Sequence, residues 1–290
     1  MKLTKNTKIL IVGLGLIGGS YAEALSAKGY ELGAIDTKKS SIDYALAKGW
    51  IKSGRTEAEK DYVSQFDLVV FALYPHLLAE WIEKYQSFFK SGALITDVTG
   101  VKGSVVRKVQ SILRKDVEFV GAHPMAGRET SGVESANAQI FNDANYIVTP
   151  TSENTEENIE ACKELGRELG FERISELSPE EHDEIVGFLS HLTHCIAVSL
   201  MVSKDNEHLA EYTGDSFRDL TRIAKINDEM WSELFLANKD ELVAQMELFE
   251  KQFDSLKKAI ISEDREKIRK TMRLSTERRK TFDKDAQETK

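Results

Sequence analysis

Three glycines with the spacing G-x-G-x-x-G, Gly13, Gly15 and Gly18, directly follow an uninterrupted apolar run near the start of the chain. Where a strand runs into a helix, such glycines allow a tight turn, a close approach of the backbone to a pyrophosphate and close helix packing. The backbone N–H groups around Leu16 and Ile17 would then meet the phosphates at the positive end of the helix dipole. The pattern predicts a dinucleotide-binding turn.

An acidic residue stands where the ribose of such a dinucleotide would lie. Asp36 follows a second apolar run, residues 32–35, and its carboxylate can accept hydrogen bonds from a ribose 2′-hydroxyl. A 2′-phosphate would meet that carboxylate with like charge, so Asp36 favours NAD, although Lys38 and Lys39 keep NADP open. Glycine-rich turns can serve packing alone, but strand, glycines and acid in register favour a bound cofactor.

Further apolar runs predict an α/β sheet whose strand ends would gather around the cofactor. The run at 68–73 is followed by Tyr74 and Pro75, which we expect beside the dinucleotide because ligands collect at the carboxyl ends of parallel strands. A strand at 146–148 and a further helix and strand ending at Ile174 would complete the same sheet.

One histidine is placed to act in catalysis. His123 follows the predicted strand 118–121, in a turn bracketed by Gly121 and Gly127, and Pro124 stiffens its exit. A lone histidine is most often structural, but a loop at the functional edge of a sheet favours a chemical role. Because imidazole titrates near neutral pH, His123 could act as a general base or hydrogen-bond acceptor.

The pattern becomes helical after residue 177. Ser178 and Glu181 have the spacing of a capping box, and we expect a first helix over residues 179–203 with no strands after it. This helix places His191 and His194 on one face. They lack a clear third ligand and the H-E-x-x-H pattern, so we predict no metal site and leave core packing and a substrate contact open.

These patterns divide the chain into residues 1–177, which would bind the cofactor, and residues 178–290, a helical domain. Late in the helical part, apolar residues step alternately by four and three, as in a coiled-coil seam. The seam consists of Leu242, Met246, Phe249, Phe253, Leu256 and Ile260. It either packs within its own domain or forms the interface of a homodimer, and we predict the homodimer.

Composition narrows the class of partner. The 290 residues include 39 Lys and Arg against 48 Asp and Glu, a net charge of −9, which argues against a nucleic-acid or anionic-membrane surface. An anionic substrate would therefore need a local basic group. We find neither a secretory signal nor an apolar stretch of about twenty residues, and Cys162 and Cys195 are far apart. We predict a cytoplasmic protein with reduced thiols.

Five segments together resemble the prephenate dehydrogenase family. They are VGLGLIGGS at 12–20, ITDVTGVK at 95–102, VGAHPMAGRETSGVE at 120–134, HDEIVGFLSHLTH at 182–194 and GDSFRDLTRIAKINDEMW at 214–231. The resemblance implies an α/β Rossmann-like dinucleotide-binding domain followed by an all-α dimerisation domain. It also implies NAD-dependent oxidation of prephenate to 4-hydroxyphenylpyruvate with release of CO2, a step of tyrosine biosynthesis.

The resemblance further implies roles for single residues. His123 matches the catalytic histidine of the family, and Arg222 matches the arginine that holds a substrate carboxylate. His194 resembles a second histidine on the substrate side. The polar and aromatic surround of the pocket is matched by Glu129, Asp219 and Trp231.

The chain departs from the family beside the catalytic histidine. Many members carry Gly-Ser-Val-Lys where this chain has Thr99-Gly100-Val101-Lys102, so the serine hydroxyl that would assist His123 is absent. Thr99 could supply a hydroxyl from the neighbouring position.

Three other functions stay open at the level of the sequence. Arogenate dehydrogenase acts on a substrate that differs only in its side chain. A β-hydroxyacid dehydrogenase would carry a lysine in its catalytic helix, where Gly187 is followed here by His191. A non-catalytic NAD sensor is disfavoured because both His123 and Arg222 are present.

Overall fold

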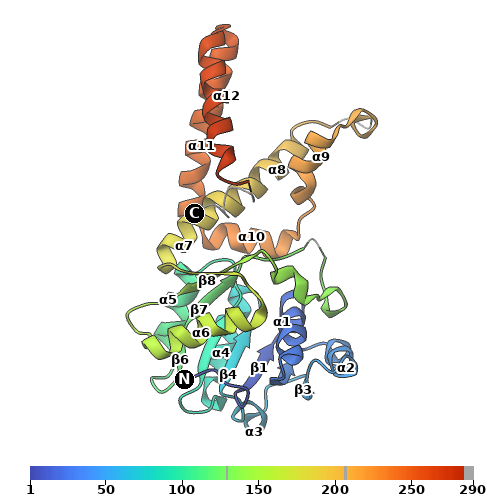
Figure 1. The fold of residues 1–290 in the computed structure, drawn as a ribbon, viewed down its shortest axis with the longest axis vertical. Coiled ribbons are helices and arrows are strands. Elements are labelled where there is room, and N and C mark those ends of the chain that lie inside the picture. Colours follow the sequence, from blue (N-terminus) through green and yellow to red (C-terminus); the bar gives the residue numbers. More distant parts are fainter. Residues whose placement is uncertain (129, 206–207, 284–290) are drawn as a thin grey trace. The chain divides into compact units, whose positions relative to one another are not determined.

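The computed structural model describes residues 1–128, 130–205 and 208–283 (Figure 1). The chain forms two compact units, residues 1–239 and residues 240–290. The first unit contains both sheets and every described residue predicted for the site. The functional division at residues 177 and 178 stays a prediction.

A parallel six-stranded sheet in the order β3-β2-β1-β4-β5-β6 forms the centre of the first unit. Its strands are β1 (Lys8–Val12), β2 (Glu31–Ile35), β3 (Ser53–Arg55), β4 (Leu68–Phe71), β5 (Leu94–Asp97) and β6 (Glu118–Phe119). The order reverses between β1 and β4, and ligands of such sheets bind at this switch point. Val12 pairs with both Ile35 and Phe71, so the carboxyl ends of these strands are level. The predicted fold class is confirmed.

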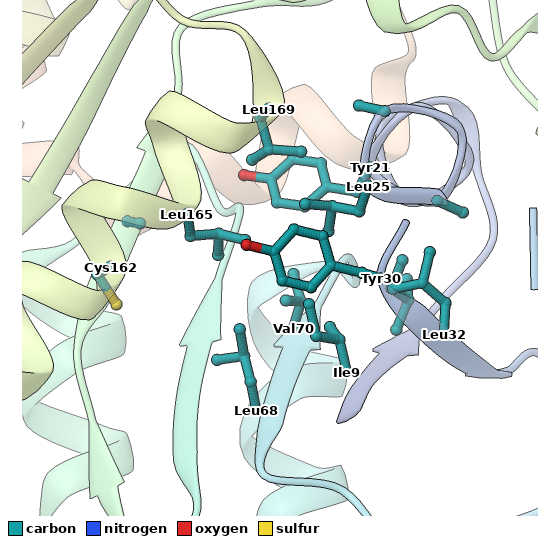
Figure 2. Packing of buried hydrophobic residues seen from close by; sticks show 14 of the residues in the cluster. Ile9, Tyr21, Leu25, Tyr30, Leu32, Leu68, Val70, Cys162, Leu165 and Leu169 are labelled. Atoms are coloured by element: carbon teal, nitrogen blue, oxygen red, sulfur yellow. The ribbon is translucent and has the colours of Figure 1, made fainter. Parts of the chain in front are cut away.

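Helices cover both faces of this sheet because consecutive strand residues are apolar and point to opposite sides. One face packs against α1 (Leu16–Ala27), α2 (Lys39–Ala47) and α6 (Glu156–Leu169), and the other against α3 (Lys60–Val63), α4 (Pro75–Tyr85) and α5 (Gly103–Ile112). Figure 2 shows the core on the face that packs against α1, α2 and α6. There, Leu165 and Leu169 of α6 lie beside Tyr21 of α1, near Ile9 and Val70 of the strands.

The remaining strands form a second sheet, so the prediction that they complete the first one was wrong. They are β7 (Gly121–Pro124), β8 (Asn145–Thr149) and β9 (Arg173–Glu176), with β7 antiparallel and β9 parallel to β8. The N–H of Val120 still bonds the carbonyl of Ile95 in β5, at 2.9 Å. The N–H of Ala122, however, bonds the side chain of Asp97 at 3.1 Å. A buried carboxylate thus takes the next ladder position, and β7 leaves the sheet.

The helical part of the first unit begins with the predicted capping box, in which Ser178 and Glu181 bond each other reciprocally. Its helices are α7 (Pro179–Val186), a π-helical turn (Gly187–Leu192), α8 (Thr193–Val202), α9 (Asp215–Thr221) and α10 (Asp228–Ala237), with short 3-10 helices at Leu209–Tyr212 and Arg222–Ala224. The predicted helix over 179–203 is therefore continuous but contains a π turn, a rare feature that is frequent at functional sites. Figure 1 shows α7, α8 and α10 beyond one end of the sheet.

An apolar stretch long enough to cross a membrane does occur, at Pro179–Val202, contrary to the expectation from the sequence. Length and composition are weak evidence for a membrane span. This stretch buries three polar side chains, His182, Asp183 and His191, and part of it belongs to the protein core. We therefore assign it to the helical part of the first unit.

The second unit, as far as it is described, contains α11 (Lys239–Ile261) and α12 (Arg265–Lys280). Asp264 caps α12 by accepting a hydrogen bond from the N–H of Lys267. Several seam residues on α11 are exposed in the single chain, including Phe253 at 62% and Ile260 at 58%. Exposed apolar side chains at this spacing leave a face that another surface could cover.

Candidate active site

The glycine turn after β1 is built so that its first and third glycines serve the fold. A Cβ on Gly13, whose φ is +97°, would lie 2.4 Å from the carbonyl oxygen of Ala72. A Cβ on Gly18 would lie 1.9 Å from the carbonyl oxygen of Gly13. Gly15 differs because its Cβ would meet nothing within 4 Å. The backbone is therefore open at Gly15, which suits the approach of a pyrophosphate.

The helix that follows offers free donors at this open position. α1 begins at Leu16, with Gly15 as an N-cap that supplies no side-chain acceptor. The first N–H groups of a helix have no partner within it, so those of Leu16 and Ile17 can bind an anion. The residues present thus fit the phosphates of a dinucleotide.

Asp36 lies at the end of β2, next to the glycine turn. One oxygen of its carboxylate accepts a hydrogen bond from the backbone N–H of Leu14 at 2.7 Å. The other accepts one from the backbone N–H of Lys38, also at 2.7 Å. These bonds fix the carboxylate beside the glycine turn, where its remaining lone pairs can accept from a ribose diol.

Tyr74 and Pro75 lie at the end of β4, the strand beside β1. Tyr74 is the N-cap of α4 and Pro75 its first residue. The Tyr74 hydroxyl accepts a hydrogen bond from the Asn227 side chain at 3.4 Å, just before α10. The predicted cofactor edge therefore contacts the helical segment that carries Trp231.

His123 lies on β7 and contacts residues from two distant segments. Its Nδ1 is 2.8 Å from Nε2 of His182 on α7. A Cβ on Gly100 would lie 3.8 Å from Cε1 of the His123 ring. Burial lowers the pKa of His123 well below its ordinary 6.5, and His182 lowers it further. The ring is therefore neutral at neutral pH and can accept a proton.

The carboxylate of Asp183, next to His182, is buried and both of its oxygens accept hydrogen bonds. Asp183 Oδ1 is 2.8 Å from Nδ1 of His182. Its two oxygens also accept hydrogen bonds from the N–H groups of Lys102 and Gly103, each at 2.7 Å. Burial alone would raise the pKa of Asp183, but these hydrogen bonds outweigh it and the pKa is lowered from 3.8.

A second buried cluster ties the β5 end to the backbone beside His123. The ammonium of Lys102, which is fully buried, lies 2.6 Å from Asp97 Oδ2. The other oxygen of Asp97 accepts the N–H of Ala122, the residue before His123. Burial lowers the pKa of Lys102, while Asp97 acts to raise it. A change to either charge would therefore leave its partner uncompensated.

Thr99, predicted to supply a hydroxyl for His123, has its side chain in this cluster, and its catalytic role stays a prediction. Its hydroxyl contacts Asp97 and lies 3.0 Å from both the Val101 carbonyl and the Lys102 ammonium. The side chain is buried. Its one proton and one of its lone pairs are therefore engaged within the cluster.

An aromatic group on α8 and α10 contains two predicted residues, His194 and Trp231. Their rings are stacked with centroids 3.6 Å apart. His194 Nδ1 lies 2.8 Å from the carbonyl of Ser190, so this nitrogen donates a proton to it. The ring of His191 meets Trp231 edge-on at 6.0 Å, and burial lowers the pKa of His191 to about 4. Of the two histidines left open, His191 is thus a core residue.

Arg222 and Asp219 lie apart from these buried groups, on the segment 208–225. Both side chains are exposed, and the 3-10 helix Arg222–Ala224 packs against α8. Glu129 lies outside the described residues. The structure thus brings His123 to Gly100 and His194 to Trp231, and it places Arg222 on the neighbouring exposed segment.

Four buried residues around His123 were not predicted as site residues: Asp97, Lys102, His182 and Asp183. A signal for them was present in the sequence. Asp97 and Lys102 flank the turn after an apolar strand, and the pair His182-Asp183 opens an apolar helix. Charged residues in such settings are buried only when paired.

Comparison with known protein families gives two matches along the chain. Residues 21–174 match the family "Prephenate dehydrogenase, nucleotide-binding domain". Residues 178–274 match the family "Prephenate dehydrogenase, dimerization domain".

Individual relatives agree with these matches. The prephenate dehydrogenase of Bacillus subtilis is 33% identical, over 92% of this chain and 74% of its own. The cyclohexadienyl dehydrogenase of Zymomonas mobilis is 31% identical, over 88% of this chain and 89% of its own. The crystal structure of prephenate dehydrogenase from Aquifex aeolicus in complex with hydroxyphenyl propionate and NAD+ is 32% identical. It has a TM-score of 0.88 and covers 98% of this chain and 100% of its own.

Proposed function

The chain belongs to the prephenate dehydrogenase family of NAD-dependent oxidoreductases, and from this premise we propose how its residues oxidise prephenate. The substrate carries a ring hydroxyl, a ring carboxylate and a pyruvyl side chain. Hydride leaves the carbon that bears the hydroxyl, and NAD, when bound, accepts it. Loss of the ring carboxylate as CO2 then makes the ring aromatic and yields 4-hydroxyphenylpyruvate.

His123 is the general base of this reaction. The observation that carries this assignment is its contact with His182, which occupies Nδ1 and leaves Nε2 to face a different partner. Its lowered pKa keeps the ring neutral, so Nε2 can take the proton of the substrate hydroxyl as the carbonyl develops. His123 thus acts where charge changes in the transition state.

Arg222 binds a carboxylate of the substrate. Its guanidinium offers two parallel donors, which match a carboxylate better than an ammonium does. Arg222 is an exposed residue of the single chain, on the segment 208–225. His194, stacked on Trp231, contributes to the substrate side of the pocket, as do Asp219 and Glu129.

The cofactor is held at the switch point of the sheet. The N–H groups of Leu16 and Ile17 bind the pyrophosphate across the open backbone at Gly15. Asp36 accepts from the ribose diol and disfavours a 2′-phosphate, so NAD is preferred over NADP. Tyr74 and Pro75 line the adjacent strand end, with Gly13 and Gly18 shaping the turn.

The active form is a cytoplasmic homodimer. Support for the dimer comes from the matched dimerization family and from the exposed apolar side chains of α11. Support for a cytoplasmic location comes from Cys162 and Cys195, which are both free thiols. Sedimentation at micromolar concentration should give about twice the chain mass of 32.6 kDa, and a fully active monomer would refute the dimer.

Arogenate dehydrogenase is the competing function, and a single assay separates the two. The purified chain is incubated with prephenate or arogenate and with NAD or NADP, and the absorbance of reduced nicotinamide is followed. We expect the highest kcat/KM with prephenate and NAD, together with formation of 4-hydroxyphenylpyruvate. A higher kcat/KM with arogenate would overturn the substrate, and equal use of NADP would overturn the role of Asp36. No turnover of either substrate would favour an NAD sensor or a β-hydroxyacid dehydrogenase.

A further inference from the structure

We propose that His182 and Asp183 are positioning residues that decide which ring nitrogen of His123 carries its proton. They form one line of hydrogen bonds with His123, from Asp183 Oδ1 to His182 Nδ1 at 2.8 Å and from His182 Nε2 to His123 Nδ1 at 2.8 Å. This inference rests on the proposed function, because it explains how His123 is kept in the form that a base requires.

The protons in this line follow from the chemistry of its ends. An ionised carboxylate only accepts hydrogen bonds, so Nδ1 of His182 must carry a proton and donate it to Asp183. In neutral His182, Nε2 then carries no proton and can only accept. Nδ1 of His123 must therefore be the donor in the second bond, and Nε2 of His123 is left with a lone pair. That nitrogen is the one available to take the substrate proton.

Asp183 is held so that it cannot reorient. Each of its oxygens also accepts a backbone N–H, from Lys102 and from Gly103, at the start of α5. The positive end of that helix favours the charged carboxylate. Its side chain is only 8% exposed, so water does not compete for these bonds. Backbone N–H groups thus hold Asp183 as the ionised, accepting end of the line.

His182 is suited to remain neutral. Its side chain is fully buried, and burial lowers its pKa from 6.5, while the hydrogen bond that it donates to Asp183 acts in the opposite direction. The other titratable groups that act on the two rings are Lys102, Asp97 and His191. Lys102 opposes a positive charge on either ring, so a second proton on His182 is disfavoured.

The same line stabilises His123 during the reaction. When Nε2 takes the proton of the substrate hydroxyl, the ring becomes a cation and its Nδ1–H becomes a stronger donor to His182. His182 passes this polarisation to Asp183, whose negative charge partly balances the new positive charge. No bond in the line needs to break, because the proton on Nδ1 stays in place.

The direct test is the tautomer of each ring in the whole protein saturated with NAD. Histidine-selective nitrogen labelling and isotope-edited NMR distinguish an Nδ1–H from an Nε2–H imidazole, and a His182→Gln spectrum assigns the lost signal. We expect the Nδ1–H form for both His123 and His182 at neutral pH. An Nε2–H form for either ring overturns the proposal, whatever the kinetics of the enzyme.

Two variants at one position separate the hydrogen bond from packing. His182→Gln keeps an oxygen acceptor near the Nε2 position, whereas His182→Phe fills the volume without one. We expect His182→Phe to lower kcat by about ten- to a hundredfold with little change in KM, and His182→Gln to recover most of that loss. Recovery of kcat in His182→Gln but not in His182→Phe would assign the effect to the hydrogen bond and not to the filled volume.

A merely structural His182 would give a different result. Both variants would then lose activity in proportion to their fall in Tm, and His182→Gln would recover no kcat relative to His182→Phe, which overturns the proposal. Failure of the proposed function is distinguishable, because His123→Ala would then retain kcat while the tautomers read by NMR stayed as expected. If His182→Phe does not fold, the NMR result on the unaltered protein still decides.

Discussion

The surroundings of His123 and of Arg222 are built in opposite ways. His123 is held by buried charged groups, including a fully buried Lys102 and an Asp183 whose two oxygens are both engaged. The segment 208–225, all of which the structure describes, contains no buried residue, and Tyr212 is 82% exposed. The proposed base is therefore fixed by the chain itself, while the segment proposed to bind the carboxylate leaves apolar surface uncovered.

This difference indicates how the two parts contribute to catalysis. Groups that act where charge develops are most effective when they are oriented before the substrate arrives, because no reorganisation is then needed during the reaction. A group that binds the substrate can become ordered on binding, at a cost to affinity and not to the chemical step. The predictions below test whether these two roles separate.

The largest effect is expected at the base. His123→Ala should lower kcat by roughly a hundred- to ten-thousandfold, because it removes a positioned general base, with KM much less changed. Steady-state kinetics with prephenate and NAD measure both constants. A near-normal kcat would mean that His123 is structural, and the base would then have to be sought at His194.

Stability should respond strongly in the buried region only. Lys102→Met should lower the free energy of unfolding by about 3–5 kcal/mol, because it leaves the buried Asp97 without its cation. Lys225→Met, an exposed lysine on the segment 208–225, should change it by less than about 0.5 kcal/mol. Denaturant titration of both variants measures these changes. Equal losses of unfolding free energy would contradict the expected difference between the two regions.

Arg222 should show the opposite kinetic pattern to His123. Arg222→Ala should raise KM for prephenate by about ten- to a hundredfold, the range expected for a lost hydrogen-bonded ion pair, with a smaller change in kcat. Arg222→Lys should recover only part of this loss, because lysine lacks the planar fork. A fall in kcat without a rise in KM would instead place Arg222 with the catalytic groups.

The smallest effect is expected where the chain departs from its family. A Cβ on Gly100 would meet Leu234 at 3.5 Å and His123 at 3.8 Å, which are ordinary contacts, so Gly100→Ser should fold normally. Because His182 already orients the His123 ring, the added hydroxyl should change kcat by less than about threefold, under 1 kcal/mol. A tenfold rise would show that the ring is poorly oriented without a serine.

The sequence was most informative where a site is local. The glycine turn, Asp36 and the strand ends are set by neighbours in the chain, and the structure has them at one edge of the sheet as expected. The Asp183 and His182 line could not be predicted because it joins α7 to β7 across 59 residues of sequence. Spacing along the chain carries no information about such a contact.

The second sheet escaped prediction for a related reason. The apolar pattern predicts a strand at 118–121 with His123 in the turn after it, whereas His123 lies on β7 and pairs with β8. Asp97 takes the N–H of Ala122 in place of a backbone carbonyl, and β7 then pairs with β8. The sequence also did not reveal that the Thr99 hydroxyl is engaged by the Asp97 and Lys102 pair.

The pH dependence of kcat/KM for prephenate, measured with saturating NAD, tests the central claim that His123 acts as a neutral, pre-oriented base. This constant reports the pKa of the free enzyme's base, and the protonated ring cannot accept the substrate proton, so activity is lost as pH falls through that pKa. Burial lowers the pKa of His123, so kcat/KM should stay level through pH 6.5 and fall only well below it. His123→Ala should lack that limb. An acid limb centred at or above 6.5, or one that survives in His123→Ala, would contradict the account.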